Sequence, residues 1–167
     1  MPLVRSATEA DAAALLDIYR PFVERSAVSF ETDVPSVDEF AARIAAAHVW
    51  LVAEVDGACV GYAYGGPHRA RAAYQWSVET SVYVHDDHHR RGIARSLYTE
   101  LLAELERRGF CNAYAGTTLP NPASVAFHES FGFEPIGVFK KIGRKFGAWH
   151  DVAWLHRALR DAPPEGE

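Results

Sequence analysis

The chain of 167 residues has few cysteines and no long apolar run. The two cysteines, Cys59 and Cys111, are too few for a disulfide framework, and we expect each to be a small buried side chain in a strand. No apolar run is long enough to span a membrane, and the N-terminus lacks the apolar segment of a signal peptide. These absences predict a cytoplasmic protein with no membrane partner.

Positive charge is also scarce, with 17 Lys and Arg against 22 Asp and Glu. The formal net charge of -5 argues against a general nucleic-acid-binding protein, because such proteins normally carry a basic surface. The eight histidines indicate no metal site, since His85, His88 and His89 share one polar turn without a second ligand cluster. Composition is typical of one domain, which we place at residues 1–160, followed by a flexible tail at 161–167.

Apolar periodicity and turn signals predict a mixed α+β fold with helices packed on the faces of a sheet. Capping boxes at Thr8 and Ser36 predict two helix starts, and Pro21 is expected to kink or interrupt the first helix. Asp56-Gly57 is typical of a hairpin turn. The predicted strands are residues 3–7, 50–55, 58–64, 76–84, 111–117, 136–145 and 149–159, and two later helices cover residues 93–108 and 123–131.

Residues 81–105 combine a strand, a polar turn with a glycine and an amphipathic helix. Arg90, Arg91 and Arg95 add positive charge where the helix begins. The helix dipole makes that charge unfavourable there unless an anion binds, and the first N–H groups of a helix are suited to phosphate. From these residues alone, a phosphate site and a solvated basic surface both remain open.

The turn resembles the cofactor signature of the GCN5-related N-acetyltransferase (GNAT) superfamily: Gln or Arg, two residues, Gly, one residue, then Gly or Ala. Here it reads His89-Arg90-Arg91-Gly92-Ile93-Ala94, with histidine at the first position. Other stretches resemble the phosphinothricin acetyltransferase subfamily, whose members act on phosphinothricin, methionine sulfoximine or methionine sulfone. They are residues 50–55, 70–71, 78–84, 119–121 and 147–152. The resemblance implies the GNAT fold, a central mixed, mostly antiparallel twisted sheet flanked by helices on both faces.

The resemblance implies acetyl-CoA as co-substrate and no metal. Its pyrophosphate would lie on the N–H groups of residues 91–96, and its pantetheine arm would pair with backbone groups of Val82 and Val84. Asn121 matches an asparagine implicated in cofactor or active-site contacts, with a plain turn role as the alternative. The candidate cofactor-binding residues are Val82, Tyr83, Val84, His89, Arg90, Arg91, Gly92, Ile93, Ala94, Arg95, Ser96, Asn121 and Ser124.

Amine acetylation requires a base for the ammonium, a donor for the developing oxyanion and charge relief for the leaving thiolate. Glu79 matches the proposed base of the subfamily, acting through water; we expect it to be buried, and a solvated strand glutamate is the alternative. An N–H near Val82 or Tyr83 would polarise the thioester carbonyl. His128 stands where many GNAT members carry an acid tyrosine, although it could instead hydrogen-bond the cofactor or cap a core.

The acceptor would carry an α-carboxylate beside its amine. Arg69 and Arg71 match the basic pair of the subfamily's acceptor loop, and guanidinium groups bind carboxylate in a bidentate way. Phe30, Tyr74 and Tyr83 would form apolar walls and a hydroxyl contact. The predicted function is acetyl transfer to the α-amine of a small L-amino acid or analogue. The alternatives are transfer to a protein N-terminus, polyamine or aminoglycoside, and a non-catalytic acyl-CoA-binding module.

The last two strands carry four large aromatic residues, Phe139, Phe146, Trp149 and Trp154. From the residues alone we expect these side chains in the core. In similar proteins this end of the sheet helps to form a homodimer, so the resemblance implies one here.

Overall fold

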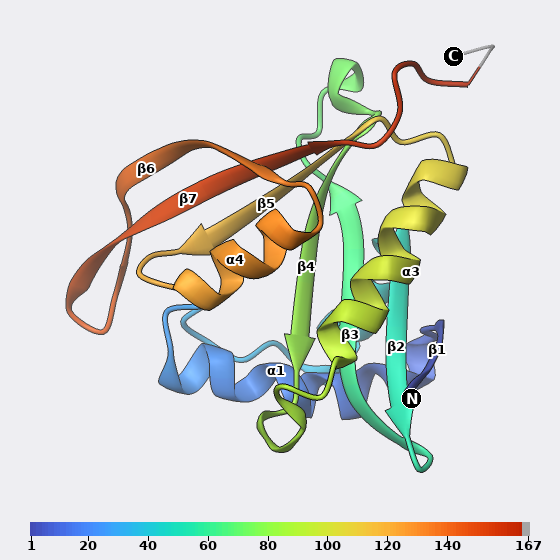
Figure 1. Ribbon diagram of the computed structural model, residues 1–167. Coiled ribbons are helices and arrows are strands. Elements are labelled where there is room, and N and C mark those ends of the chain that lie inside the picture. Colours follow the sequence, from blue (N-terminus) through green and yellow to red (C-terminus); the bar gives the residue numbers. More distant parts are fainter. Residues whose placement is uncertain (165–167) are drawn as a thin grey trace.

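The computed structural model describes residues 1–164, so part of the predicted tail, residues 165–167, lies outside the described residues. In this part of the chain, one sheet has the strand order β1-β2-β3-β4-β5-β7-β6 (Figure 1). The strands are β1 (Leu3–Ser6), β2 (Val49–Val55), β3 (Ala58–Pro67), β4 (Ser77–Val84), β5 (Asn112–Thr118), β6 (Glu134–Lys145) and β7 (Ala148–Ala158). The α-helices are α1 (Ala12–Arg25), α2 (Val37–Ala46), α3 (Ile93–Arg107) and α4 (Pro122–Ser130). Neighbouring strands are antiparallel except for β4 and β5, so the predicted mixed, mostly antiparallel sheet is confirmed.

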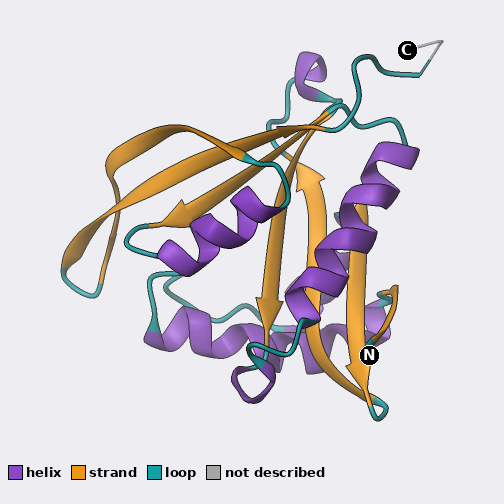
Figure 2. Cartoon of the chain, viewed as in Figure 1, coloured by secondary structure: helices purple, strands orange, loops and turns teal. Residues whose placement is uncertain are grey.

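Helices cover both faces of the sheet, as predicted (Figure 2). On one face, α3 buries Leu97 and Leu101 against alternate residues of the strands, such as Leu51. On the other face, α1 and α2 pack on the residues of opposite parity, such as Val52 and Tyr62. Because side chains alternate along a strand, a central strand such as β2 is apolar on both faces. No helix among residues 1–164 is long and apolar enough to cross a membrane.

Most local signals are confirmed, with three differences. The capping box at Ser36 forms, since Ser36 Oγ accepts the Glu39 N–H at 3.1 Å and the Glu39 carboxylate accepts the Ser36 N–H at 3.0 Å. Of the kink or interruption expected at Pro21, the interruption is wrong, because buried residues before and after Pro21 hold α1 on the sheet. Cys111 is buried but Cys59 is only half-buried. Of the four C-terminal aromatic residues expected in the core, Phe139, Phe146 and Trp149 are exposed on the β6–β7 hairpin, which projects beyond α4 in Figure 1, and only Trp154 is half-buried.

The sheet splits where β4 and β5 diverge (Figure 1). The two strands pair only from Ser77–Asn112 to Glu79–Tyr114, although β4 continues to Val84 and β5 to Thr118. Strand β3 runs three residues further than predicted, to Pro67, and pairs with β4 from Val84 back to Val78, while β5 pairs with β7 along the whole length of β5. Both halves of the sheet therefore stay ordered, and an opening, the β4–β5 gap, forms between them.

Candidate active site

Backbone groups of β4 point into the β4–β5 gap. The His85 N–H donates to the Val60 carbonyl at 2.8 Å, so the odd-numbered residues of β4 face β3. Val82 therefore presents its N–H and carbonyl groups to the gap, and Val84 presents its N–H, while the Val84 carbonyl accepts from His89. An extended chain with amide groups, such as a pantetheine arm, can pair with these groups as an added strand. Two N–H groups were predicted to donate to the thioester carbonyl. The N–H of Val82 faces the gap, whereas the N–H of Tyr83 faces β3.

The N-terminus of α3 has free N–H groups at the position predicted for an anion site. Gly92 caps the helix with φ +76°, a left-handed conformation that glycine adopts without strain. The N–H groups of Ile93, Ala94 and Arg95 have no carbonyl partner within the helix, because the helical ladder begins with Ser96, whose N–H donates to Gly92 at 3.0 Å. The predicted range of N–H donors, which included Ser96, is therefore one residue too long. Three N–H groups at a helix start fit a pyrophosphate.

The side chains around this turn have separate roles. Arg91, Gly92 and Ser96 line an open groove of about 730 Å³, and Arg90 and Arg91 are exposed. The guanidinium of Arg95 donates to Ser130 Oγ at 2.9 Å, which links α3 to α4. His89 Nε2 lies 2.9 Å from the Val84 carbonyl and must donate to it, so His89 ties the turn to the end of β4. This contact gives a physical role to the histidine that departs from the GNAT signature.

Asn121 and Ser124 line the β4–β5 gap at the start of α4. Asn121 Oδ1 accepts the Ser124 N–H at 3.2 Å and so caps the helix. Ser124 Oγ lies 3.0 Å from Thr117 Oγ1. The helix-capping role of Asn121 is thus observed, and its place on the gap keeps the predicted cofactor contact open.

A second opening, the main cleft, lies on the α1–α2 face of the sheet and has a volume of about 730 Å³. Glu79, at the last β4–β5 pair, lines it together with Ser81 and the predicted residues Phe30, Arg69 and Tyr83. Glu79 is not buried as predicted: 39% of its side chain is exposed, because the strand pairing on one side ends there. Its carboxylate lies 3.5 Å from His68 Nδ1.

Two predicted substrate-binding residues do not line the main cleft. Arg71 and Tyr74 are exposed at the two ends of a short turn after β3, and neither lies among the described residues that form the cleft. The sequence placed them by their loop, but a loop position does not fix the direction of a side chain.

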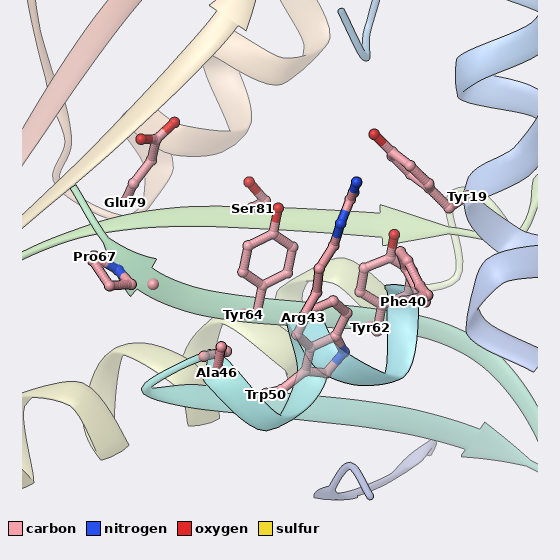
Figure 3. A pocket seen from close by; sticks show the side chains of 12 residues that line it. Tyr19, Phe40, Arg43, Ala46, Trp50, Tyr62, Tyr64, Pro67, Glu79 and Ser81 are labelled. Carbon is pink, nitrogen blue, oxygen red and sulfur yellow. The ribbon is translucent and has the colours of Figure 1, made fainter. Parts of the chain in front are cut away.

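The sequence analysis missed an aromatic pocket of about 360 Å³ that shares Tyr19, Arg43, Tyr64, Glu79 and Ser81 with the main cleft. Figure 3 shows the side chains of Glu79, Ser81, Tyr64, Arg43 and Tyr19 extending from the sheet and helices into this space. The pocket also contains Trp50 and Tyr62, whose rings stack with their centroids 5.2 Å apart. The alternation of Tyr62 and Tyr64 along β3 was a usable signal, whereas the position of Arg43 depends on how α2 packs.

His128 belongs to a buried chain of hydrogen bonds on the opposite face of the sheet. Its Nδ1 lies 2.8 Å from the Ser124 carbonyl and therefore donates to it, so Nε2 accepts from the Tyr98 hydroxyl at 2.8 Å. Tyr98 in turn lies 2.9 Å from Thr80 Oγ1. Burial lowers the pKa of His128 below its ordinary value. Glu79 and His128 thus lie on opposite faces of the sheet, with the gap between them.

The comparisons with known proteins agree with this geometry. A family model described as an acetyltransferase (GNAT) domain matches residues 4–154. The phosphinothricin N-acetyltransferase of Streptomyces viridochromogenes is 42% identical over 165 residues, which cover 96% of this chain and 90% of that protein. The L-methionine sulfoximine/L-methionine sulfone acetyltransferase of Salmonella typhimurium is 33% identical and covers 93% of this chain and 94% of that protein.

Solved structures give the same result. A GNAT superfamily phosphinothricin acetyltransferase from Sinorhizobium meliloti, in complex with AcCoA, matches with a TM-score of 0.94 and 33% identity, over 99% of this chain and 94% of that chain. The chain therefore belongs to the GNAT acetyltransferase family. Within that family it is an acetyl-CoA-dependent N-acetyltransferase.

Proposed function

We propose that this enzyme transfers an acetyl group from acetyl-CoA to the α-amine of a small L-amino acid analogue: phosphinothricin, methionine sulfoximine or methionine sulfone. The observation that carries the proposal is the position of Glu79 where the β4–β5 gap meets the main cleft. The donor would reach this point through the gap and the acceptor through the cleft. Relatives of 42% and 33% identity named for these acceptors support the choice of substrate.

Glu79 is the proposed base. When bound, acetyl-CoA would supply an activated thioester in the gap. Glu79 would accept a proton from the acceptor ammonium, directly or through one water, and the free amine would then attack the carbonyl carbon. The Val82 N–H would donate to the oxygen on which negative charge develops, and the carbon–sulfur bond would break as the amide forms.

His128 is the proposed acid that returns a proton to the leaving thiolate. In the neutral ring Nε2 accepts from Tyr98, so His128 would act as the acid only as the imidazolium: Nε2 would then pass its proton to the Tyr98 hydroxyl, Tyr98 would pass one to Thr80, and Thr80 would pass one to the thiolate. Tyr98 is fully buried, which keeps this path away from bulk water.

Arg69 is the proposed ligand of the acceptor carboxylate, since Arg69 lines the main cleft together with Glu79 and, among residues 1–164, only one of its terminal nitrogens, Nη1, has a partner, the His68 carbonyl. Phe30 and Tyr83 would form the walls. Arg71 and Tyr74 remain predictions for this role, although neither side chain lines the cleft.

A thiol-release screen with purified enzyme and acetyl-CoA tests the proposal. We expect turnover with phosphinothricin, methionine sulfoximine or methionine sulfone, and much slower release with a polyamine, an aminoglycoside or a peptide with a free N-terminus. The guanidinium of Arg69 disfavours a polycationic acceptor in the same cleft. Turnover with the polycations alone would replace the proposed substrate class, and acetyl-CoA binding without turnover on any amine would favour the non-catalytic alternative.

We also propose a cytoplasmic homodimer that forms through the β6–β7 hairpin. Exposed apolar side chains on the hairpin support this interface, because such clusters mark protein–protein contacts: Ile136, Val138, Phe139, Ile142, Phe146 and Trp149. Light scattering at micromolar concentration should give twice the chain mass of 18.5 kDa. The charge substitution Phe139→Glu should shift the mass towards that of one chain, whereas a wild-type monomer would contradict the proposal.

A further inference from the structure

Lys145, at the end of β6, is a buried cation outside the predicted site. It is only 5% exposed, and its Nζ donates to the carbonyl of Ser29 at 2.7 Å. The ring of Phe146 lies 5.2 Å from the same atom. Burial lowers the pKa of the Lys145 ammonium, while the nearby Glu31 carboxylate acts in the opposite direction. Burying an ammonium is costly unless its hydrogen bonds are made, so this contact fixes the Ser29 backbone firmly.

The segment that Lys145 holds is also fixed from the two helices on its other side. Ser29 Oγ lies 2.6 Å from the Tyr19 hydroxyl of α1. Glu31 accepts hydrogen bonds from Tyr19 and from both terminal nitrogens of Arg43 in α2. Residues 29 and 31 are therefore tied to α1 and α2, and Lys145 links the same segment to the β6–β7 hairpin.

Phe30, between these two tied residues, forms a wall of the main cleft. Its ring packs on the backbone of Gly143 so closely that a Cβ at Gly143 would lie less than 3.0 Å from the ring atoms. The ring centroid of His150 in β7 is 6.3 Å away. Residues 28–31 all line the cleft. The position of this wall therefore depends on contacts with β6, more than a hundred residues away in the sequence.

We propose that Lys145 is a positioning residue: its ammonium fixes residues 28–31 on the β6–β7 hairpin and so sets Phe30 as the wall against which the acceptor binds. This inference rests on the proposed function of the main cleft as the acceptor site. Lys145 lies outside the β4–β5 gap and the α3 turn, and of residues 28–31 only Val28 also lines the gap, so the effect should fall mainly on the acceptor. A small misplacement of a positioning group weakens productive binding without removing the reacting groups.

Lys145→Met tests the proposal, because it removes the ammonium and keeps a chain of similar length. We expect the acceptor KM for methionine sulfone to rise about tenfold, with kcat and the acetyl-CoA KM within about threefold of wild type. Lys145→Arg keeps a cationic donor and should recover part of the loss. Lys140→Met is the matched control, since Lys140 is on the same strand with 76% of its side chain exposed. The proposal would be overturned if kcat, the acceptor KM and the acetyl-CoA KM all worsened by the same factor, or if none of them changed.

Hydrogen exchange without substrate separates this proposal from the proposed function. The amides of residues 28–32 should exchange faster in Lys145→Met than in wild type, whichever acceptor the enzyme uses. If Lys145→Met does not fold, Gly143→Ala tests whether the position of Phe30 sets acceptor binding. This substitution leaves the Lys145 ammonium in place but displaces the Phe30 ring, so the acceptor KM should rise while the other constants stay unchanged. Unchanged exchange in Lys145→Met, or an unchanged acceptor KM in Gly143→Ala, would show that Lys145 only supports the hairpin. If the wild-type enzyme shows no turnover but residues 28–32 exchange faster in Lys145→Met, only the substrate assignment is refuted, and the role of Lys145 stands.

Discussion

Replacing Glu79 by glutamine should lower kcat for acetyl transfer by about 10²- to 10⁴-fold, the usual contribution of a positioned general base. Glutamine has nearly the same shape but cannot accept the ammonium proton. The carboxylate is at the junction of the gap and the main cleft, so its loss should affect the chemical step more than binding. Thiol release at saturating acceptor and acetyl-CoA measures the effect, and the acetyl-CoA KM should change little.

Glu106→Gln is the matched control for this substitution, since Glu106 is an exposed carboxylate on α3, remote from the main cleft. It should retain wild-type rates. If Glu79→Gln keeps more than about a tenth of the wild-type kcat, Glu79 is not the base, and the proton must leave through another group.

The fold was largely predictable because local signals and packing agree. The Ser36 capping box, the Asp56-Gly57 turn and the apolar spacing of α3 each specify structure within a few residues, and all are present. The errors occur where distant contacts decide. The interruption expected at Pro21 is absent because buried residues on either side of it, such as Tyr19 and Val23, hold α1 on the sheet. The hairpin aromatics were expected in the core, but no element of residues 1–164 covers Phe139, Phe146 or Trp149.

The candidate site divides in the same way. Its motif-bearing parts, the α3 turn and Glu79, follow from short stretches of sequence whose backbone geometry is local. Beyond Phe30 and Tyr83, the walls of the main cleft do not, since Tyr19, Arg43 and Trp154 meet there from three separate regions of the chain. The direction of a loop side chain is likewise not local, so Arg69 lines the cleft while Arg71 does not. The sequence thus placed the motif-bearing parts better than the walls of the main cleft.

Tyr98→Phe should lower the free energy of unfolding by about 2–6 kcal/mol, because it leaves two buried polar groups without a partner. The Tyr98 hydroxyl donates to His128 Nε2 and accepts from Thr80, and both partners are less than a tenth exposed. Each such group costs about 1–3 kcal/mol when left unpaired. Urea unfolding measures the change, and Tyr74→Phe, at an exposed tyrosine, should change it by less than about 0.5 kcal/mol. A similarly small loss for Tyr98→Phe would mean that the hydrogen bonds linking Thr80, Tyr98 and His128 contribute nothing to stability.

The pH dependence of the free energy of unfolding gives a second test of these hydrogen bonds, through the titration of His128. Burial holds the pKa of His128 in the folded state below its ordinary value of 6.5. Between these two pKa values, the unfolded state therefore binds more protons than the folded state. The stabilising contribution is therefore complete above pH 6.5 and is lost as the pH falls below it, by at most about 1.4 kcal/mol per pH unit for one proton. His48 shifts in the same direction, so a His48→Gln background isolates the part due to His128. Stability that stays flat through this window in that background would mean that His128 titrates like a solvated histidine.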